Sequence, residues 1–349
     1  MRYNGNKIKV AFKGESHAKK ISLHIKGLEK GLKFNQEEIE KKIKLRHPDY
    51  IFNTPRKEPE EIIFEKGYDL NGTTGKELVI SIFNKDSNTR FHKKLKGFLR
   101  PGHADYVGYI TQKNYKFDSS SFSGRMTALM VVLGEISKEL LKDEIIVISH
   151  IYKIGDIYDQ PLNILKMDDI DLLNDDFPVI DKNKKAQMIN LLENINKNKD
   201  SIGAQIETVI YNLKEGIGDV FFDSLEGEIS KNIFTIPAVK AIEFGEGTNF
   251  SNLKGSEAND SFYYDGKIKT KTNHNGGING GISNGMPIRI ITTIKPTPSI
   301  GKPQTSFNVI TNQEETRIIK GRNDSFIANR AIPAINGAVY YSLLNLTRR

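Results

Sequence analysis

The sequence contains no cysteine. This absence excludes a disulfide framework, a thiolate nucleophile and any zinc or iron–sulfur site built on cysteine. Catalysis would therefore rest on histidine, carboxylates, cations or a cofactor. The seven histidines, at positions 17, 24, 47, 92, 103, 150 and 274, show no close metal-ligand spacing, so we expect no metal.

Long apolar runs are also missing. The most hydrophobic stretch, residues 128–133, is soon followed by Glu135 and Lys138, whereas a membrane-spanning helix needs about 18 to 20 apolar residues in succession. Residues 1–10 have neither the apolar region nor the small-residue cleavage site of a signal peptide. We therefore expect no membrane partner and a cytoplasmic location.

The chain has 349 residues and a net charge of +8. Such a charge can indicate nucleic acid, a strongly anionic small substrate or a lysine-rich surface. Most of the excess is lysine scattered through segments such as 41–44 and 93–96, where a solvated surface is the ordinary explanation. Because basic and aromatic residues are not interleaved, we expect no nucleic-acid partner.

Hydrophobic periodicity predicts alternating strands and helices. Apolar and polar residues alternate over 21–25, which predicts a strand, and Asn35 is placed as the N-cap of a following helix. Further strands are expected at 78–83, 145–151 and 287–294. Residues 126–141 have a helical period and are apolar all round in the first half, which predicts a helix inside the molecule.

The sequence also contains the pattern of an internal repeat. Residues 16–32 match residues 201–217 at a constant offset of 185, and Arg125 and Arg330 each lead a long apolar helix. We interpret this as one domain, 1–349, with similar halves of about 1–160 and 200–349, long helices inside and sheets outside. Residues 162–200, with an amphipathic helix around 184–195, are predicted to be a surface excursion. Chance matching of strand and turn patterns is the alternative.

Two loops combine groups that can carry chemistry. His17 follows Gly14, Glu15 and Ser16 just before the first strand, where a side chain can face a cleft, although an ordinary hydrogen-bonded histidine also fits. Residues 100–105 present an arginine, a histidine and an aspartate on a Pro-Gly loop, for which a plain turn is the alternative. Asp105 could orient His103 or cap the next element.

The glycine-rich run 275–285 leads through a strand to the sequence Lys-Pro-Thr-Pro-Ser at 295–299. Glycines let backbone amides approach an anion or a flat ring, and a lysine with two hydroxyls suits a phosphate. Neither a Walker A loop nor the dinucleotide spacing is present. Residues 321–324 add a cation and a carboxylate on the same side of an extended segment. For the glycine-rich run the alternative is a set of generic glycine turns, and for residues 321–324 it is a surface ion pair.

Taken together, these motifs resemble the chorismate synthase family. The resemblance follows the family's order through nearly the whole chain, in blocks at 14–31, 100–105, 201–219, 236–240, 255–257, 272–287, 295–303 and 321–333. It implies an α+β fold, a β-α-β sandwich of two pseudo-symmetric halves with buried long helices between outer antiparallel sheets. It also implies a homotetramer.

The resemblance further implies a carbon–oxygen lyase of the shikimate pathway that serves aromatic amino acid biosynthesis. The expected reaction is the anti-1,4-elimination of phosphate and the C6 proton from 5-enolpyruvylshikimate 3-phosphate to give chorismate. The expected cofactor is reduced FMN (FMNH2), used without net redox change. Because no dinucleotide motif or reductase domain is visible, we expect an external flavin reductant, and NADP is expected only in association with it.

Residue roles also follow from the resemblance. His17 would donate a proton to the departing phosphate, His103 would protonate or stabilise the reduced flavin, and Asp324 would relay the proton that arrives there. The substrate-binding residues would be Ser16, Arg46, Arg100 and, shared with the cofactor, Arg322. The cofactor-binding residues would be Arg125, Met126, Thr127, Pro237, Ala238, Gly280, Lys295, Pro296, Thr297, Pro298, Ser299 and Arg322.

The chain departs from the family pattern at residues 122–131. The family usually shows Gly-Gly-Gly-Arg-Ser-Ser-Ala-Arg-Glu-Thr, and here the segment reads Phe-Ser-Gly-Arg-Met-Thr-Ala-Leu-Met-Val. Met126 has no hydroxyl and the second arginine is absent. Another arginine expected shortly after Arg46 is missing too. These changes leave open a catalytically impaired flavin- or phosphate-binding protein on the same scaffold.

Overall fold

Two five-stranded antiparallel sheets frame the protein. The computed structural model describes residues 2–4, 8–15, 18–53, 60–84, 96–113, 115, 117, 122–142, 144–164, 166–319 and 323–347. The first sheet has the order β1 (Arg2–Asn4), β2 (Lys9–Lys13), β3 (Lys20–Lys26), β7 (Leu78–Phe83) and β4 (Ile62–Lys66). The second has the order β11 (Val239–Phe244), β16 (Ile288–Ile294), β10 (Ala204–Tyr211), β8 (Ile146–Ile154) and β9 (Ile157–Tyr158).

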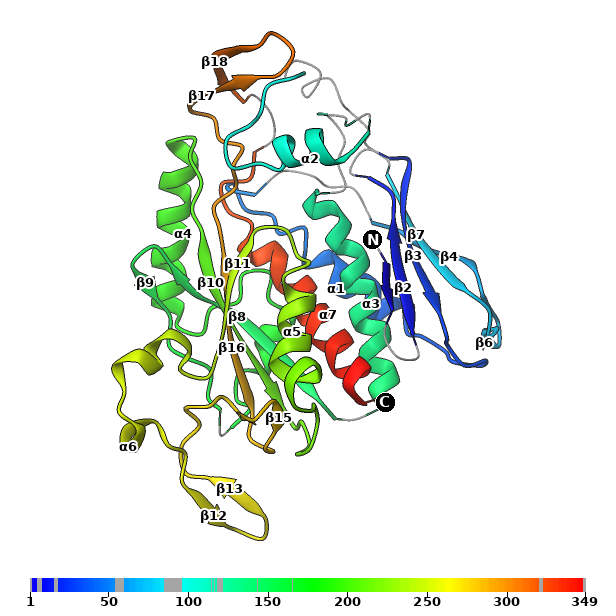
Figure 1. Ribbon diagram of the computed structural model, residues 1–349, viewed down its shortest axis with the longest axis vertical. Coiled ribbons are helices and arrows are strands. Elements are labelled where there is room, and N and C mark those ends of the chain that lie inside the picture. The colour runs from blue at the N-terminus through cyan, green and yellow to red at the C-terminus, as the bar shows by residue number, and fades with distance from the viewer. Residues whose placement is uncertain are drawn as a thin grey trace.

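Helices fill the layer between the two sheets (Figure 1). They are α1 (Gln36–Lys44), α3 (Thr127–Leu141), α5 (Leu225–Ile233) and α7 (Ala328–Thr347). Helix α3 contacts β3 of the first sheet, while α7 contacts β8 and β10 of the second. The alternating side chains of β3, Ile21, Leu23 and Ile25, are fully buried against this layer, which is why the chain forms a strand with one apolar face there.

Helices α3 and α7 touch at two glycines. A Cβ atom added to Gly134 would lie 2.1 Å from the Cα of Gly337, and one added to Gly337 would lie 2.5 Å from the carbonyl oxygen of Met130. Any side chain at either position would therefore force the helices apart. This close approach buries α3 on nearly all sides along residues 128–134, as its apolar composition predicted.

The remaining elements lie around this three-layer body. The helices are α2 (Asp105–Thr111), α4 (Lys182–Lys197) and α6 (Gly255–Ala258), with short 3₁₀ turns η2 (Gly124–Met126), η3 (Ile170–Asn174), η4 (Phe221–Asp223) and η5 (Gly247–Asn252). The hairpins are β5 (Tyr68–Asp69) with β6 (Gly72–Thr73), β12 (Phe262–Tyr264) with β13 (Ile268–Thr270), β14 (Ile278–Asn279) with β15 (Ile282–Ser283), and β17 (Pro303–Asn308) with β18 (Gln313–Ile318). Figure 1 shows α2 and β17–β18 at one end of the molecule and β12–β13 at the other.

The structure confirms the local predictions. Asn35 is the N-cap of α1, and its side chain accepts a hydrogen bond from the Glu38 amide at 3.2 Å. The amide of Asn35 itself donates to Glu139 of α3, so the start of α1 is fixed to the helical layer. One boundary differs, because α7 begins at Ala328 and Arg330 lies within its first turn rather than before it.

Residues 159–164 and 166–181, which we call the covering segment, lie over the outer face of the second sheet. Ile148 of β8 and Val209 and Tyr211 of β10 form a separate apolar cluster there with Leu162. The partly buried side chains packed on it come mostly from the covering segment and are Ile146, Ile164, Met167, Leu172, Leu173 and Ile180. This part of the polar stretch 162–200 therefore forms a small core of its own, and the amphipathic helix expected in that stretch is α4.

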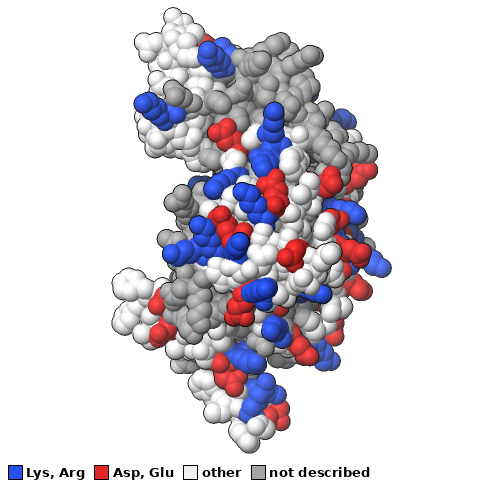
Figure 2. Space-filling view, turned by 90° about the vertical axis from the view of Figure 1, so that its right-hand side faces the viewer, with Lys and Arg blue, Asp and Glu red and all other residues white. Residues whose placement is uncertain are grey.

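The surface bears both signs of charge. Figure 2 shows lysines and arginines interspersed with acidic residues over the face formed by the first sheet, so the positive excess is not gathered into one basic patch on that side. Within the described part of the chain, no helix is long and apolar enough to cross a bilayer.

Candidate active site

Asp105 organises the loop that carries Arg100 and His103. Its Oδ2 accepts hydrogen bonds from the amide and Nε of Arg100, at 3.1 and 2.6 Å, and its Oδ1 accepts from Arg100 Nη2 at 2.7 Å and from the Tyr115 hydroxyl at 3.0 Å. Burial alone would raise the pKa of Asp105, but the hydrogen bonds from Arg100 and His103 hold it well below the ordinary value. The carboxylate therefore stays ionised and fixes both neighbours.

The ring of His103 is oriented through one nitrogen. Nδ1 lies 3.0 Å from Asp105 Oδ1 and 3.1 Å from Arg100 Nη2. A carboxylate only accepts and a guanidinium only donates, so Nδ1 satisfies one of these neighbours at a time. When Nδ1 carries hydrogen and donates to Asp105, Nε2 is the nitrogen left to meet a ligand. The side chain keeps 22% of its surface exposed, which allows such contact.

This loop is joined to the segment 295–299. The Nζ atom of Lys295 donates to the carbonyl oxygen of Gly102 at 2.5 Å, and a Cβ on Gly102 would stand 3.4 Å from Pro298. The Lys295 amide donates to the carbonyl of Ala238. Strand pairing explains why Lys295 lies beside Ala238, because Val239 at the start of β11 pairs with Ile294 at the end of β16. Ala238 has a positive φ of 75°, which is uncommon for a residue with a side chain.

Lys295 lies in a cationic setting. Burial, and then the positive charge of Lys240, lower its pKa from the ordinary lysine value. An anion bound against Lys295 would therefore relieve an existing repulsion.

Asp324 lies on the other side of the same segment. Its carbonyl oxygen accepts from the Thr297 hydroxyl at 2.5 Å, and its carboxylate oxygens lie 2.9 and 3.1 Å from Nη1 of Arg330. The Nε atom of Arg330 donates to the carbonyl of Arg46 at 2.8 Å. The first turn of α7 thus connects the loop of Asp324 with the end of α1.

Arg46 is buried and paired with Glu60. Its Nη1 bonds to a Glu60 oxygen, while Nη2 reaches the carbonyl of Gly124 at 3.1 Å and the Thr127 hydroxyl at 3.3 Å. Burial would raise the pKa of Glu60, but Arg46 and His47 lower it to about 2. An anionic substrate at Arg46 would consequently share this guanidinium with a protein carboxylate.

Residues 122–131, which depart from the family pattern, lie mostly in the hydrophobic core. Met126 and Leu129 are buried in the main apolar cluster, and Arg125 is 7% exposed, with its guanidinium 3.4 Å from the Asn84 side chain and from the Phe83 carbonyl. The positions of the lost hydroxyl and arginine therefore serve packing. The Arg46 guanidinium still reaches this segment through Gly124 and Thr127.

The described site residues divide into one connected group and one outlier. His103 and Arg100 are linked through Gly102 to Lys295, Pro298 and Ala238. Thr297 is linked through Asp324 and Arg330 to Arg46 and Thr127. Pro237, Pro296 and Ser299 flank members of this group in sequence. Gly280, in the turn between β14 and β15, lies beyond the opposite end of β16, a strand about 23 Å long. Ser16, His17 and Arg322 lie outside the described residues.

Comparison with known proteins decides the family. The family model of chorismate synthase matches residues 8–347. The chain belongs to the chorismate synthase family. A chorismate synthase of Thermococcus kodakarensis is 34% identical over 343 residues, which cover 96% of this chain and 95% of the relative. One of Methanococcus maripaludis is 36% identical over 358 residues, covering 98% and 96%.

A solved structure agrees in fold. A crystal structure of chorismate synthase superposes with a TM-score of 0.72 at 20% sequence identity, and covers 98% of this chain and 92% of that one. Membership of the chorismate synthase family places the chain among lyases that act on a phosphate-bearing substrate in the shikimate pathway, which serves aromatic amino acid biosynthesis. A catalytically impaired protein on the same scaffold is not favoured.

Sequence reasoning missed three groups around this chorismate synthase site. Glu60 compensates Arg46 and Tyr115 supports Asp105, and nothing in the local sequence of either residue marks it as a partner of a distant loop. Arg330 was noted only as leading a helix. Its spacing of six residues after Asp324, at the start of an apolar helix, was the available signal. Among the described residues, no group of three or more His, Asp and Glu side chains is arranged to hold a metal ion.

Proposed function

We propose that the protein eliminates phosphate and the C6 proton from 5-enolpyruvylshikimate 3-phosphate to give chorismate, at the junction of residues 100–105, 295–299 and 324–330. The observation that carries this proposal is the contact between Lys295 and Gly102. It brings the loop of Arg100 and His103 to residues 295–299, whose lysine and hydroxyls suit a phosphate. The substrate bears two carboxylates and a phosphate, so its site needs several cations. Lys295 places one cation at this junction, and Arg46, Arg100 and Arg322 are the arginines proposed to hold the substrate anions.

We place reduced FMN at the same junction. Burial and the charge of Lys240 lower the pKa of Lys295, and this setting favours an anionic neighbour. Residues 295–299, Ala238, Thr127 and Arg125 would hold the flavin. When bound, the reduced flavin supplies electron density transiently while the allylic phosphate leaves.

The protein's own residues then place charge and protons. Asp105 holds the His103 ring so that Nε2 is available to protonate or stabilise the anionic ring of the cofactor. Asp324, held by Arg330, would pass on the proton that comes from the substrate. The proposed donor to the departing phosphate is His17, assisted by Ser16. Arg46, Arg100 and Arg322 would hold the substrate anions.

An anaerobic assay tests the proposal. Chorismate formation is followed with chemically reduced FMN in the wild type and in the variants His17→Ala, His103→Ala and Asp324→Ala, with His274→Ala as a control far from this junction in sequence and contacts. We expect turnover in the wild type and the control, and losses of about 10²-fold or more in the other variants. A wild type that binds FMN without turnover would instead support the impaired protein.

The finer architecture is part of the same proposal. We infer a single domain made of two pseudo-symmetric halves, about 1–160 and 200–349, because β3 and β10 occupy the middle of their sheets. Each half also supplies one long helix, and the two helices meet at Gly134 and Gly337. A homotetramer, an external flavin reductant with NADP as its associated nucleotide, a cytoplasmic location and the absence of a nucleic-acid or membrane partner remain predictions from the sequence.

A further inference from the structure

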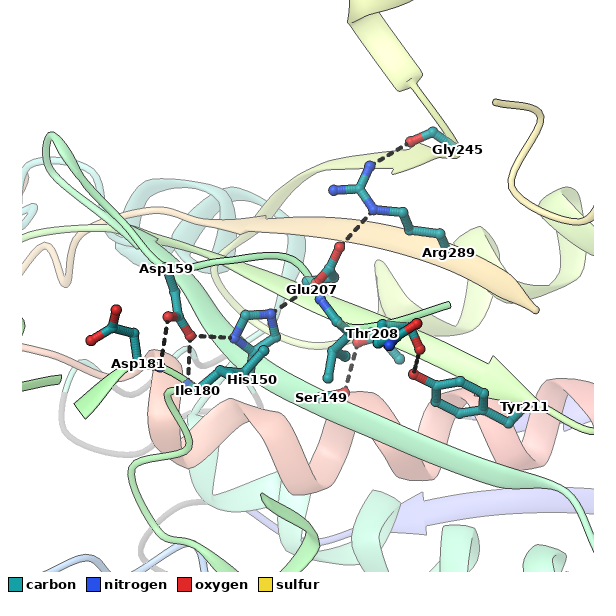
Figure 3. Close-up of polar contacts among 12 residues, drawn as sticks. Ser149, His150, Asp159, Ile180, Asp181, Glu207, Thr208, Tyr211, Gly245 and Arg289 are labelled. Carbon is teal, nitrogen blue, oxygen red and sulfur yellow. Dashed lines mark hydrogen bonds and ion pairs between the residues drawn. The ribbon is translucent and has the colours of Figure 1, made fainter. Parts of the chain in front are cut away.

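A buried ionic cluster lies on the outer face of the second sheet (Figure 3). His150 of β8 stands between two carboxylates, with Nδ1 3.0 Å from Asp159 Oδ2 and Nε2 2.9 Å from Glu207 Oε2. All three side chains are fully buried. Arg289 of β16 donates from Nε to the second Glu207 oxygen at 2.6 Å.

The partners of His150 require both ring nitrogens to carry hydrogen. Ionised carboxylates only accept hydrogen bonds, so each of the two short contacts needs an N–H from the ring. With His150 protonated, two cations balance two anions in the cluster. Without that proton, the buried site holds an excess negative charge and one carboxylate loses its donor, which is strongly unfavourable away from water.

The direction of the His150 pKa agrees with this geometry. Burial alone would lower it, but the hydrogen bonds that the ring donates to Asp159 and Glu207 raise it above the ordinary histidine value. The ring of Tyr152 also lies beside the imidazole, edge-on to it, with the two ring centres 6.0 Å apart. Arg289 stacks over Tyr152 at 5.9 Å and reaches the cluster through Glu207.

Both carboxylates also accept hydrogen bonds from backbone amides of the covering segment, Glu207 from its place in the sheet and Asp159 from within the segment itself. Asp159 accepts from the amides of Ile180 and Asp181 at 2.6 and 3.0 Å, and Glu207 accepts from the amide of Leu162 at 2.6 Å. These bonds hold the covering segment near both of its ends. Asp181 in turn caps α4, because its side chain accepts from the next helical amides.

We propose that His150 is a protonation-dependent latch that fastens the covering segment to the outer face of the second sheet. While the imidazole is charged, Asp159 and Glu207 are neutralised and remain buried with their backbone partners. When the proton leaves, the two carboxylates repel each other, and opening of the covering segment admits water to both.

The latch connects with the proposed active site through α4. At the end of this helix, Asn196 accepts from the Ser325 hydroxyl at 3.0 Å, and Ser201 donates to the carbonyl of Thr297 at 2.7 Å. Ser325 adjoins Asp324. This connection to catalysis rests on the proposed function, whereas the latch itself does not.

The sign of the pH effect follows from linkage. The folded pKa of His150 lies above that of an exposed histidine, about 6.5. Closure of the covering segment is therefore most stable below about pH 6.5 and weakens as pH rises toward the folded pKa. Between the two pKa values, opening becomes about tenfold more favourable for each pH unit, and above the folded pKa it levels off.

Hydrogen exchange of the full chain between pH 6 and 9, corrected for the intrinsic rate at each pH, tests the latch. Wild-type peptides within 159–181 should lose at least about tenfold protection across this range. The variant His150→Gln should show low protection that does not change with pH. The matched control His24→Gln, at a partly buried histidine of β3 in the other sheet, should keep the wild-type pattern.

Two results would overturn the proposal. One is wild-type protection of 159–181 that is the same at pH 6 and pH 9. The other is a wild-type pH dependence that persists in His150→Gln. Should that variant fail to fold, Glu207→Gln and NMR titration of the His150 ring give the answer. Removal of one carboxylate charge should lower the His150 pKa and move the loss of protection to lower pH, and an unchanged midpoint would refute the latch.

Discussion

Arg330 holds both carboxylate oxygens of Asp324 with a single nitrogen, Nη1, while its Nε donates to the backbone of Arg46. One side chain in the first turn of α7 therefore sets the position of a proposed proton carrier relative to a proposed substrate arginine. Such positioning matters because small misplacements of reacting groups cost large factors in rate.

Arg330→Lys should lower kcat/KM about 10- to 100-fold while FMN affinity changes little. A lysine keeps the positive charge but cannot bond Asp324 and the Arg46 carbonyl together. Steady-state kinetics and FMN titration under anaerobic conditions measure the two effects. The control Arg317→Lys, in the β17–β18 hairpin, should behave as the wild type. Equal activity of Arg330→Lys and wild type would contradict the positioning role.

Lys295→Met should weaken the binding of reduced FMN about tenfold, which corresponds to about 1.4 kcal/mol. The methionine keeps most of the side-chain volume but removes the charge and the bond to Gly102. Anaerobic calorimetry gives the affinity. Lys269→Met removes a lysine paired with Asp265 in the exposed β12–β13 hairpin and should leave the affinity unchanged. A comparable loss in both variants would point to net charge rather than to this site.

Glu60→Gln should remove a pH-dependent part of the stability. The pKa of Glu60 is about 2 in the folded protein, against 4.5 for the unperturbed group. Because the folded pKa is depressed, its contribution, on the order of 3 kcal/mol, is present above about pH 4.5 and is lost as pH falls toward 2. Denaturant unfolding at pH 7 and pH 3 should show a smaller difference in the variant than in the wild type. An identical pH dependence would show that Glu60 is not the responsible carboxylate.

Gly337→Ala should destabilise the protein by about 1 to 3 kcal/mol, the usual cost of overpacking a tight core. Its new Cβ would meet the carbonyl of Met130 in α3. Thermal and denaturant unfolding provide the measurement. Gly255→Ala, where nothing lies within 4 Å of the added atom, is the matched control and should change stability by less than about 0.5 kcal/mol.

Local features of the fold could be predicted because they depend on neighbours in sequence. The alternation at Ile21, Leu23 and Ile25 and the cap at Asn35 are properties of short windows, and the structure has them where they were expected. The role of residues 162–181 could not be predicted in this way. The stretch is mostly polar, and its few apolar side chains become buried only against the outer face of a sheet that is distant in sequence.

In the candidate site, too, contacts between sequence neighbours could be predicted and contacts between distant segments could not. The loop of Arg100, His103 and Asp105 could be predicted because its three groups lie within six residues and bind one another. The compensation of Arg46 by Glu60, and the link from Lys295 to Gly102, depend on pairing between separate parts of the chain. No pattern in one sequence specifies such pairings. The resemblance to a family located the loops but not Glu60, the carboxylate that pairs with Arg46.

The contact between Gly134 and Gly337 also limits how the molecule can move. A shift of either helix along the other by a single residue would bring a side chain to a place where only hydrogen atoms fit. The pair of helices α3 and α7 therefore resists sliding, and it keeps the two sheets that pack on it at a fixed spacing. We therefore expect adjustments during turnover to occur in the peripheral loops and in the covering segment rather than at this helix contact.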